Sequence, residues 1–380
     1  MRNEKTVSVQ DEERTGLQLG LFMPNCSNMY AISTYRSDRA EPDEWPYESN
    51  KRIALAAEEA GMHFLFPVSR WRGFGGKTNY LGTSMETMTW AAALLAVTRS
   101  IHIYSTVHVP VFHPLVAAKM GATLDHISNG RWGINIVSGW SKGEFAMMGL
   151  DLMPHAERYQ RTAAFIEILK GLWTQEPGTF NFSSSWYNIT GGYVMPQPVR
   201  KPNPPIANAG VSAEAKDLVA RYCDIAFIGP PSIEASGDMT REFKERAQKY
   251  NRTVGCACFP FVLWRETEKE AQDECRRIID HMDREAVENW ARGIISDNGS
   301  FDQFTLEMFT LGAGALPVIG TTEQVALKLK RLYELGMDGV LMAFLSYYED
   351  TVRFGKEIAP LLRQMGVLAS PHEPPPASIH

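Results

Sequence analysis

The feature that most constrains the fold is a regular alternation of short apolar segments and longer amphipathic ones along almost the whole chain. The apolar segments lie at residues 17–23, 63–68, 101–107, 131–137, 205–209, 224–229, 254–264 and 339–345. Apolar runs of this length are typical of parallel strands buried on both faces, and such strands need a crossover helix between them. Eight such units favour an α/β fold, a closed (β/α)8 TIM barrel with insertions, over an open sheet.

A single barrel is expected to occupy residues 16–366 of the 380-residue chain, a length that suits this fold when it carries insertions. Two insertions are expected. One is a hairpin near 178–198, and the other is a lid or insertion in the glycine-rich stretch near 294–320. Residues 1–15 are predicted to form a flexible leader, and the proline-rich residues 367–380 a disordered tail.

Charge and composition exclude several classes of protein. The formal net charge is −6, which argues against a nucleic-acid-binding protein that neutralises phosphates. No apolar run reaches the roughly 18–20 residues that a membrane helix needs. The polar N-terminus has the character of neither a signal nor a transit peptide. The five cysteines and the histidines lack the spacing of metal ligands, so we expect no metal site. Free cysteines favour a reducing compartment, so we expect a cytoplasmic protein.

The segment 131–144, RWGINIVSGWSKGE, is the first place to look for a site. Its apolar run contains one amide, Asn135, and opens into a polar loop after Val137. In parallel α/β folds, ligands bind at the carboxyl ends of the strands. Because a buried amide must have its hydrogen bonds satisfied, Asn135 contacts either a neighbouring strand or a ligand.

Thr106 lies near the carboxyl end of another predicted strand, and its hydroxyl likewise contacts either a neighbouring strand or a ligand. Threonine is common in strands on structural grounds alone, so both interpretations stay open. His108, His113 and His155 are candidates for acid–base chemistry.

Two places favour an anion. Arg158 and Tyr159 lie in the first turns of a predicted helix, and Ser212 follows a strand immediately before another helix. Helix N-termini attract anions such as phosphate through their free N–H groups and their dipole. Salt bridging and simple helix capping are the structural alternatives.

A glycine-rich loop follows the second strand, GFGG at residues 73–76, with Arg70, Arg72 and Lys77 around it. It matches neither GxGxxG nor the GK[ST] ending of a P-loop. The loop therefore either contacts a ligand or is a solvated turn. No nucleophile elbow or convincing carboxylate pair is present, which favours an enzyme whose cofactor carries the chemistry.

Several long motifs resemble one family. They are RGFGGKT at 72–78, ATLDHISNGRWGINIVSGW at 122–140, ERYQR at 157–161 and LWTQE at 172–176. Together they resemble the bacterial-luciferase-like, two-component flavin monooxygenases, and within these the branch that contains the pyrimidine and dimethyl sulfone monooxygenases. The resemblance spans about residues 17–366.

The resemblance implies a (β/α)8 enzyme that uses reduced FMN and O2. It places flavin contacts at Ser69, Arg70, Asn135, Glu144, Arg158, Tyr159 and Ser212, and an oxygen site at Thr106 and Asn135. Arg72 is a further candidate, for polarising a substrate oxygen.

The implied activity is oxygenation and cleavage of a small heteroatom-containing molecule, such as a cyclic amide or a pyrimidine-like ring. Oxygenation of a sulfone or sulfonate with C–S cleavage, and deazaflavin-dependent hydride transfer, are the alternatives. The implied partners are a separate NAD(P)H:flavin reductase and further copies of the chain in a dimer or tetramer. The pair Ser69-Arg70 stands where the pyrimidine enzymes have Ile-Lys, and residues 108–114 also differ, so uracil is not carried over as the substrate.

Overall fold

A computed structural model of the chain describes residues 16–29, 31–36, 44–295 and 301–370. Eight parallel strands close into a barrel in the order β1-β12-β9-β8-β7-β4-β3-β2, so the predicted fold class is confirmed. These strands are β1 (Gln18–Phe22), β2 (Phe64–Phe66), β3 (His102–His108), β4 (Trp132–Val137), β7 (Ile206–Asn208), β8 (Ile225–Ile228), β9 (Gly255–Cys258) and β12 (Gly339–Met342). Because β1 pairs with both β2 and β12, the ring closes on the first strand of the chain.

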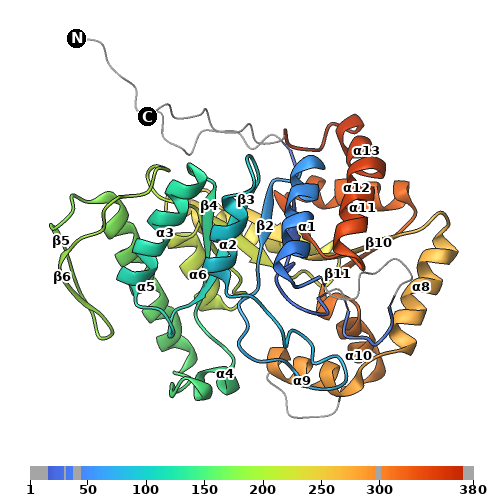
Figure 1. Cartoon of the computed structure of the whole chain (residues 1–380), viewed down its shortest axis with the longest axis horizontal. Coiled ribbons are helices and arrows are strands. Elements are labelled where there is room, and N and C mark those ends of the chain that lie inside the picture. Colours follow the sequence, from blue (N-terminus) through green and yellow to red (C-terminus); the bar gives the residue numbers. More distant parts are fainter. Residues whose placement is uncertain (1–15, 30, 37–43, 296–300, 371–380) are drawn as a thin grey trace, which may run out of the picture.

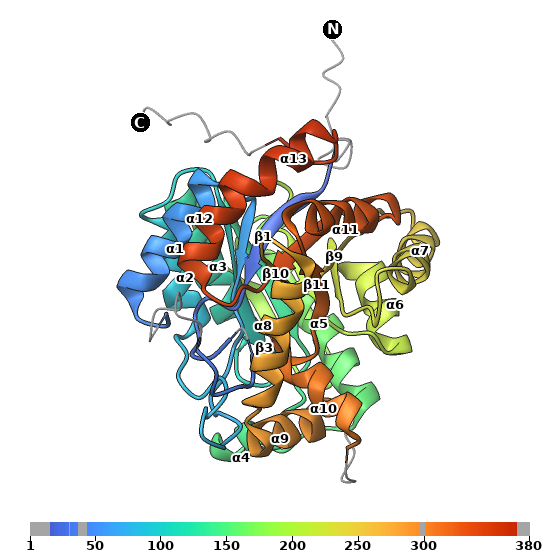
Figure 2. The same cartoon turned by 90° about the vertical axis from the view of Figure 1, so that its right-hand side faces the viewer.

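Helices surround this barrel (Figures 1 and 2). They are α1 (Tyr47–Glu59), α2 (Thr87–Leu95), α3 (Pro114–Ser128), α4 (Lys142–Met147), α5 (His155–Thr174), α6 (Ala213–Tyr222), α7 (Ala235–Gln248), α8 (Glu268–Asp280), α9 (Arg284–Ile295), α10 (Gln303–Thr310), α11 (Thr322–Glu334), α12 (Tyr347–Glu357) and α13 (Ala359–Gln364). The local sequence explains where several of these helices begin and end. In α3, for example, Pro114 occupies the first turn and Asn129 caps the other end in a left-handed conformation.

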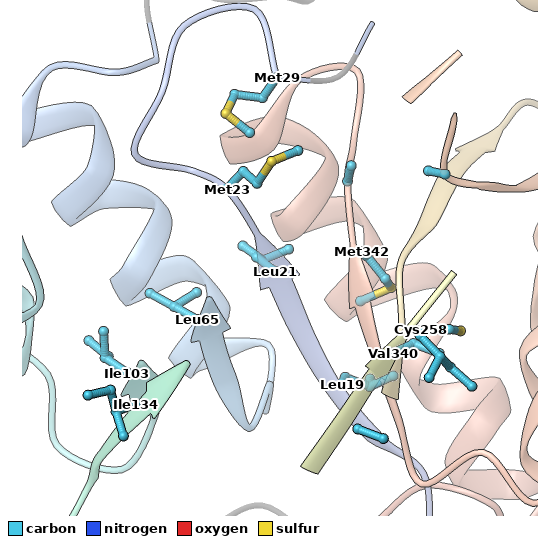
Figure 3. Packing of buried hydrophobic residues seen from close by; sticks show 14 of the residues in the cluster. Leu19, Leu21, Met23, Met29, Leu65, Ile103, Ile134, Cys258, Val340 and Met342 are labelled. Carbon is cyan, nitrogen blue, oxygen red and sulfur yellow. The ribbon is translucent and has the colours of Figure 1, made fainter. Parts of the chain in front are cut away.

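Side chains alternate between two cores along each barrel strand. Leu65, Ile103 and Ile134 belong to the large core that the strands share with the helices, and Figure 3 shows them close together. Phe64 and Tyr104 belong to a second, smaller cluster. The Tyr104 ring occupies the space over Gly133, where an added Cβ would lie 2.4 Å from it, so β4 needs glycine at this position.

The segment 254–264 is two strands, not the single strand that its apolar run predicts. β9 belongs to the barrel, whereas β10 (Pro260–Trp264) pairs in parallel with β11 (Leu316–Gly320) as a separate sheet. Pro260 has no N–H with which to continue a ladder, which favours the break at this point. The segment that contains β11 also holds α10 and a 3₁₀ turn, η1 (Gly312–Gly314), while residues 296–300 lie outside the described part.

An antiparallel pair, β5 (Phe180–Ser183) and β6 (Asn188–Gly192), lies between α5 and β7. The prediction of a disordered tail is wrong for residues 367–370. The Leu17 N–H donates to the Val367 carbonyl at 2.6 Å, and the Ala369 N–H donates to the Leu17 carbonyl at 3.1 Å. These residues therefore belong to the folded barrel. The expected leader and the remainder of the tail, 371–380, lie outside the described residues.

The buried Arg131 joins three segments at the amino end of β4. Its guanidinium donates to the carbonyls of Leu95, Thr98 and Ile101 at 2.9–3.0 Å and to the Thr98 hydroxyl at 3.1 Å, and its Nε donates to the Ser128 carbonyl at 3.0 Å. All these acceptors are uncharged. The arginine therefore serves as a multiple hydrogen-bond donor that locks the start of β4 to the α2–β3 connection.

Replacing Arg131 with Met should lower the free energy of unfolding by about 3–5 kcal/mol, because several buried carbonyls lose their donor. Urea unfolding followed by circular dichroism measures this. Arg131→Lys should recover only part of the loss, since an ammonium cannot reproduce the planar fork. Full stability of Arg131→Met would contradict the assigned role.

His63 is held as a neutral ring beside the C-terminal segment. Its Nδ1 accepts from the Leu19 N–H at 3.0 Å, so its Nε2 carries the proton and donates to the Ser370 carbonyl at 3.1 Å. Burial lowers the pKa of His63 below its ordinary value of 6.5. The unfolded chain therefore binds a proton more readily, and the stability that His63 contributes is present above pH 6.5 and declines as the pH falls below it.

A His63→Phe variant, which loses both hydrogen bonds, should be less stable than the wild type at pH 7. The difference in unfolding free energy between the two proteins should shrink as the pH falls from 7 to 5. Chemical denaturation at several pH values tests this. A difference that stays constant or grows toward low pH would show that the ring is not held neutral.

Candidate active site

A cavity of about 530 Å³ opens at the carboxyl ends of the barrel strands. Residues at or just beyond β1, β2, β3, β4, β7 and β8 line it, together with parts of α5, α9 and η1. In Figures 1 and 2, α4, α9 and α10 lie at the bottom of the molecule, at the end opposite α13. The position of the cavity agrees with the rule that parallel barrels bind ligands at the carboxyl ends of their strands.

Thr106 and Asn135 face each other on neighbouring strands. They are register partners on β3 and β4, both are buried, and both line the cavity. Asn135 Nδ2 donates to Thr106 Oγ1 at 3.3 Å, and Thr106 Oγ1 donates to the Pro67 carbonyl at 2.7 Å. Asn135 Oδ1 is buried without a hydrogen-bond partner among the described residues. The structural interpretation is therefore confirmed for the bond to Thr106, and contact with a ligand stays a prediction.

Arg70 and Glu144 form a buried ion pair. Arg70 Nη2 lies 2.5 Å from Glu144 Oε2, and each side chain is only 2% exposed. The Glu144 carboxylate also accepts from Arg70 Nε at 3.1 Å and from the backbone N–H groups of Trp71 and Arg72 at 2.8 and 3.1 Å. Glu144 thus holds the loop after β2 against α4.

Two aromatic rings lie beside the Arg70 guanidinium. It lies 4.6 Å from the centre of the Trp140 ring and 5.3 Å from that of Phe74, and these two rings are nearly parallel, with an interplanar angle of 6°. Trp290 of α9 packs edge-on against both. Stacking on aromatic faces stabilises a cation and fixes its orientation.

His108, at the end of β3, is a buried histidine that lines the cavity. Burial, assisted by the positive charge of Arg70, lowers the pKa of His108 from 6.5 to about 4, so the ring is neutral at pH 7. Its Nδ1 is buried without a hydrogen-bond partner among the described residues.

Further polar residues of the cavity lie where α5 and α6 begin. Arg158 donates to the Gly139 carbonyl through Nη1, while its Nε is buried and has no partner among the described residues. Burial raises the pKa of Tyr159, and Ser212, within hydrogen-bonding reach of that hydroxyl, lowers it. A Cβ on Gly210 would lie 2.4 Å from Ala215 and 2.7 Å from the Tyr159 hydroxyl, so only glycine fits here.

The structure brings together Ser69, Arg70, Thr106, Asn135, Arg158 and Tyr159 as lining residues of one cavity. Three predicted site residues are not among them. Glu144 lies behind Arg70, and Ser212 caps α6 by accepting from the Ala215 N–H at 3.2 Å. Arg72 has an exposed side chain outside the lining, so nothing in its position supports contact with a substrate.

Sequence reasoning missed Asn208 and Trp290. Asn208 is fixed by donating to the Ile136 carbonyl at 2.6 Å and accepting from the Gly210 N–H at 2.9 Å. A buried amide in the segment 205–209 was the available signal, as it was for Asn135. Nothing local marks Trp290, because α9 reaches the cavity only through the tertiary fold.

In the described part of the chain, no cluster of His, Cys, Asp and Glu has the arrangement of a metal site. The same residues include no helix that is long and apolar enough to cross a membrane.

The chain is similar to known proteins over most of its length. It is 29% identical over 369 residues to the FMNH(2)-dependent dimethylsulfone monooxygenase of Pseudomonas putida, covering 92% of this chain and 96% of that one. It is 30% identical over 366 residues to the pyrimidine monooxygenase RutA of Allorhizobium ampelinum, covering 91% and 96%. A solved structure of riboflavin lyase (RcaE) superposes with a TM-score of 0.84 at 22% identity, covering 94% of both chains.

The model of one protein family matches residues 21–339, from the second half of β1 to the start of β12. The match therefore includes all the lining residues of the cavity. Together with the relatives and the closed eight-stranded barrel, it leads to one conclusion: this chain belongs to the luciferase-like monooxygenase family.

Proposed function

We propose that this enzyme uses reduced FMN, delivered by a separate NAD(P)H:flavin reductase, and O2 to oxygenate and cleave a small heteroatom-containing organic molecule. Family membership and the names of the relatives support this proposal. The observation that carries it is that the cavity lining holds two buried polar atoms without a partner among the described residues. They are the Nε of the cationic Arg158 and the amide Oδ1 of Asn135.

The anionic end of FMN matches the groups around Arg158. The buried Nε of Arg158 lacks a partner, and a buried charged group without one is costly, so an anion there satisfies it. Tyr159, Gly210 and the N-terminus of α6 surround the same space. We assign the phosphate to these residues, because helix N-termini and arginines are the usual phosphate partners.

The residues around Thr106 and Asn135 fit the reacting part of the cofactor. Reduced FMN, when bound, supplies the electrons by which O2 is split between substrate and water. Thr106 and Asn135 hold polar atoms in fixed orientation, and Ser69 and Arg70 supply further polar groups from the loop after β2. Preorganised dipoles of this kind stabilise developing charge without having to reorganise.

The walls of the cavity exclude water. Phe22 packs with Phe227 and Phe259 at ring distances of 4.9 and 4.6 Å, and all three rings line the cavity. Trp140 and Trp290 line it from the other side. A site from which water is excluded strengthens the remaining polar contacts.

Arg158→Gln should weaken binding of reduced FMN about 10- to 100-fold, because one charge-assisted hydrogen bond to phosphate contributes about 1.5–3 kcal/mol. Binding of reduced riboflavin, which lacks the phosphate, should be unchanged. Anaerobic titration of both flavins gives the affinities. Arg72→Gln is the matched control and should bind both flavins as the wild type does. Equal losses for the two flavins would contradict the phosphate assignment.

Thr106→Val removes one hydroxyl at nearly constant volume and should lower the yield of oxygenated product per O2 consumed about 10²-fold, because Asn135 Nδ2 loses the acceptor that orients the amide. Thr106→Ser should retain most of the yield, and Asn135→Ala should resemble Thr106→Val. Product and O2 are measured together, with the affinity for reduced FMN as the control. A normal yield in both Thr106→Val and Asn135→Ala would remove these residues from the oxygen site.

A further inference from the structure

The described lining of the cavity contains few charges. Arg70 and Arg158 are its only arginines, and no Lys, Asp or Glu is among the lining residues. His155, in the first turn of α5, also lines it, and its Nδ1 is 3.7 Å from Glu214 Oε2. If FMN phosphate pairs with Arg158, as in the proposed function on which this inference rests, the rest of the cavity depends on Arg70 for any positive charge.

The charge of Arg70 is already compensated. Its guanidinium contacts both carboxylate oxygens of Glu144 at 2.5 and 3.1 Å, and its central carbon lies 4.6 Å from the centre of the Trp140 ring and 5.3 Å from that of Phe74. A carboxylate or sulfonate beside it would lie close to Glu144 and would lose its hydration without gaining an unpaired cation. Burial of an uncompensated charge is strongly unfavourable.

His108 adds a polar contact without a charge. The neutral ring lines the cavity, packs edge-on against Phe145 at 6.1 Å, and keeps its Nδ1 free of partners among the described residues. A neutral imidazole donates one hydrogen bond and accepts another, so it suits a carbonyl, N–H or sulfonyl group on an uncharged molecule.

We propose that the substrate of this enzyme is an uncharged, hydrogen-bonding molecule held by His108 between aromatic walls, and that the Arg70–Glu144 pair makes the cavity reject anions. Within the reaction proposed above, this favours a cyclic amide or a sulfone over a sulfonate or a carboxylate. Glu144 is then a specificity residue that acts through Arg70, and His108 is a contact for the substrate.

Two pairs of probes that differ in charge test the proposal, namely uracil against orotate and dimethyl sulfone against methanesulfonate. Binding to the anaerobic complex with reduced FMN is followed by the fluorescence of the cavity tryptophans, without turnover. At least one neutral probe should bind the wild type ten-fold or more tightly than its anionic partner. Equal or tighter binding of the anions, or no binding of either neutral probe, would overturn the proposal.

Substitutions separate the two roles. Glu144→Gln leaves Arg70 uncompensated, so affinity for the anionic probes should rise about ten-fold. The double variant Arg70→Gln with Glu144→Gln restores neutrality and should not gain anion binding. His108→Phe should weaken the neutral probe about ten-fold, while His108→Gln should retain most of the affinity. Unchanged affinity for the anionic probes in a folded Glu144→Gln protein would contradict the role of Glu144. Unchanged affinity for the neutral probe in His108→Phe would contradict the role of His108.

The affinity for reduced FMN is measured in the same samples. If the wild type does not bind reduced FMN, the proposed function fails. If FMN binds and the probes show no preference for the neutral member, only the inference about the substrate fails.

Discussion

Closure of the barrel is the constraint on which the site depends. β1 pairs with β2 on one side and β12 on the other, so the ladder has no free edge and the strand ends form a ring. Residues from distant parts of the chain, such as Ser69, Thr106, Asn135 and Asn208, therefore reach one cavity. An open sheet would place the first and last strands at opposite edges, and the cavity would lose a wall.

Within that ring, the Arg70–Glu144 pair determines the electrostatics. The carboxylate receives the guanidinium and two backbone N–H groups, so it orders the loop after β2 and also compensates the charge that Arg70 brings to the cavity. The two cations of the lining thus differ in character. Among the described residues, Arg70 forms an ion pair with Glu144 and lies beside the Trp140 ring, whereas Arg158 donates to a backbone carbonyl and keeps an unpartnered Nε.

The sequence predicts the architecture well because apolar runs report burial directly. It predicts single side chains less well. Glu144 pairs with Arg70 and does not line the cavity, and Arg72 has an exposed side chain, so the roles expected for these two residues stay predictions. The run 254–264 divides because β10 pairs with β11, a strand about fifty residues later. No local pattern reveals such a partner, since strand pairing depends on which segments the fold brings side by side.

The sequence by itself determined the strand–helix alternation, the helix ends marked by Pro114 and Asn129, and the polar positions at strand ends such as Thr106 and Asn135. These follow from propensity and periodicity, which act over a few residues. Only the tertiary structure decided that Glu144 neutralises Arg70, that His108 is buried and neutral, and that Trp290 completes the wall. Burial and charge compensation are set by contacts between segments far apart in the chain, so they appear only once the barrel has closed.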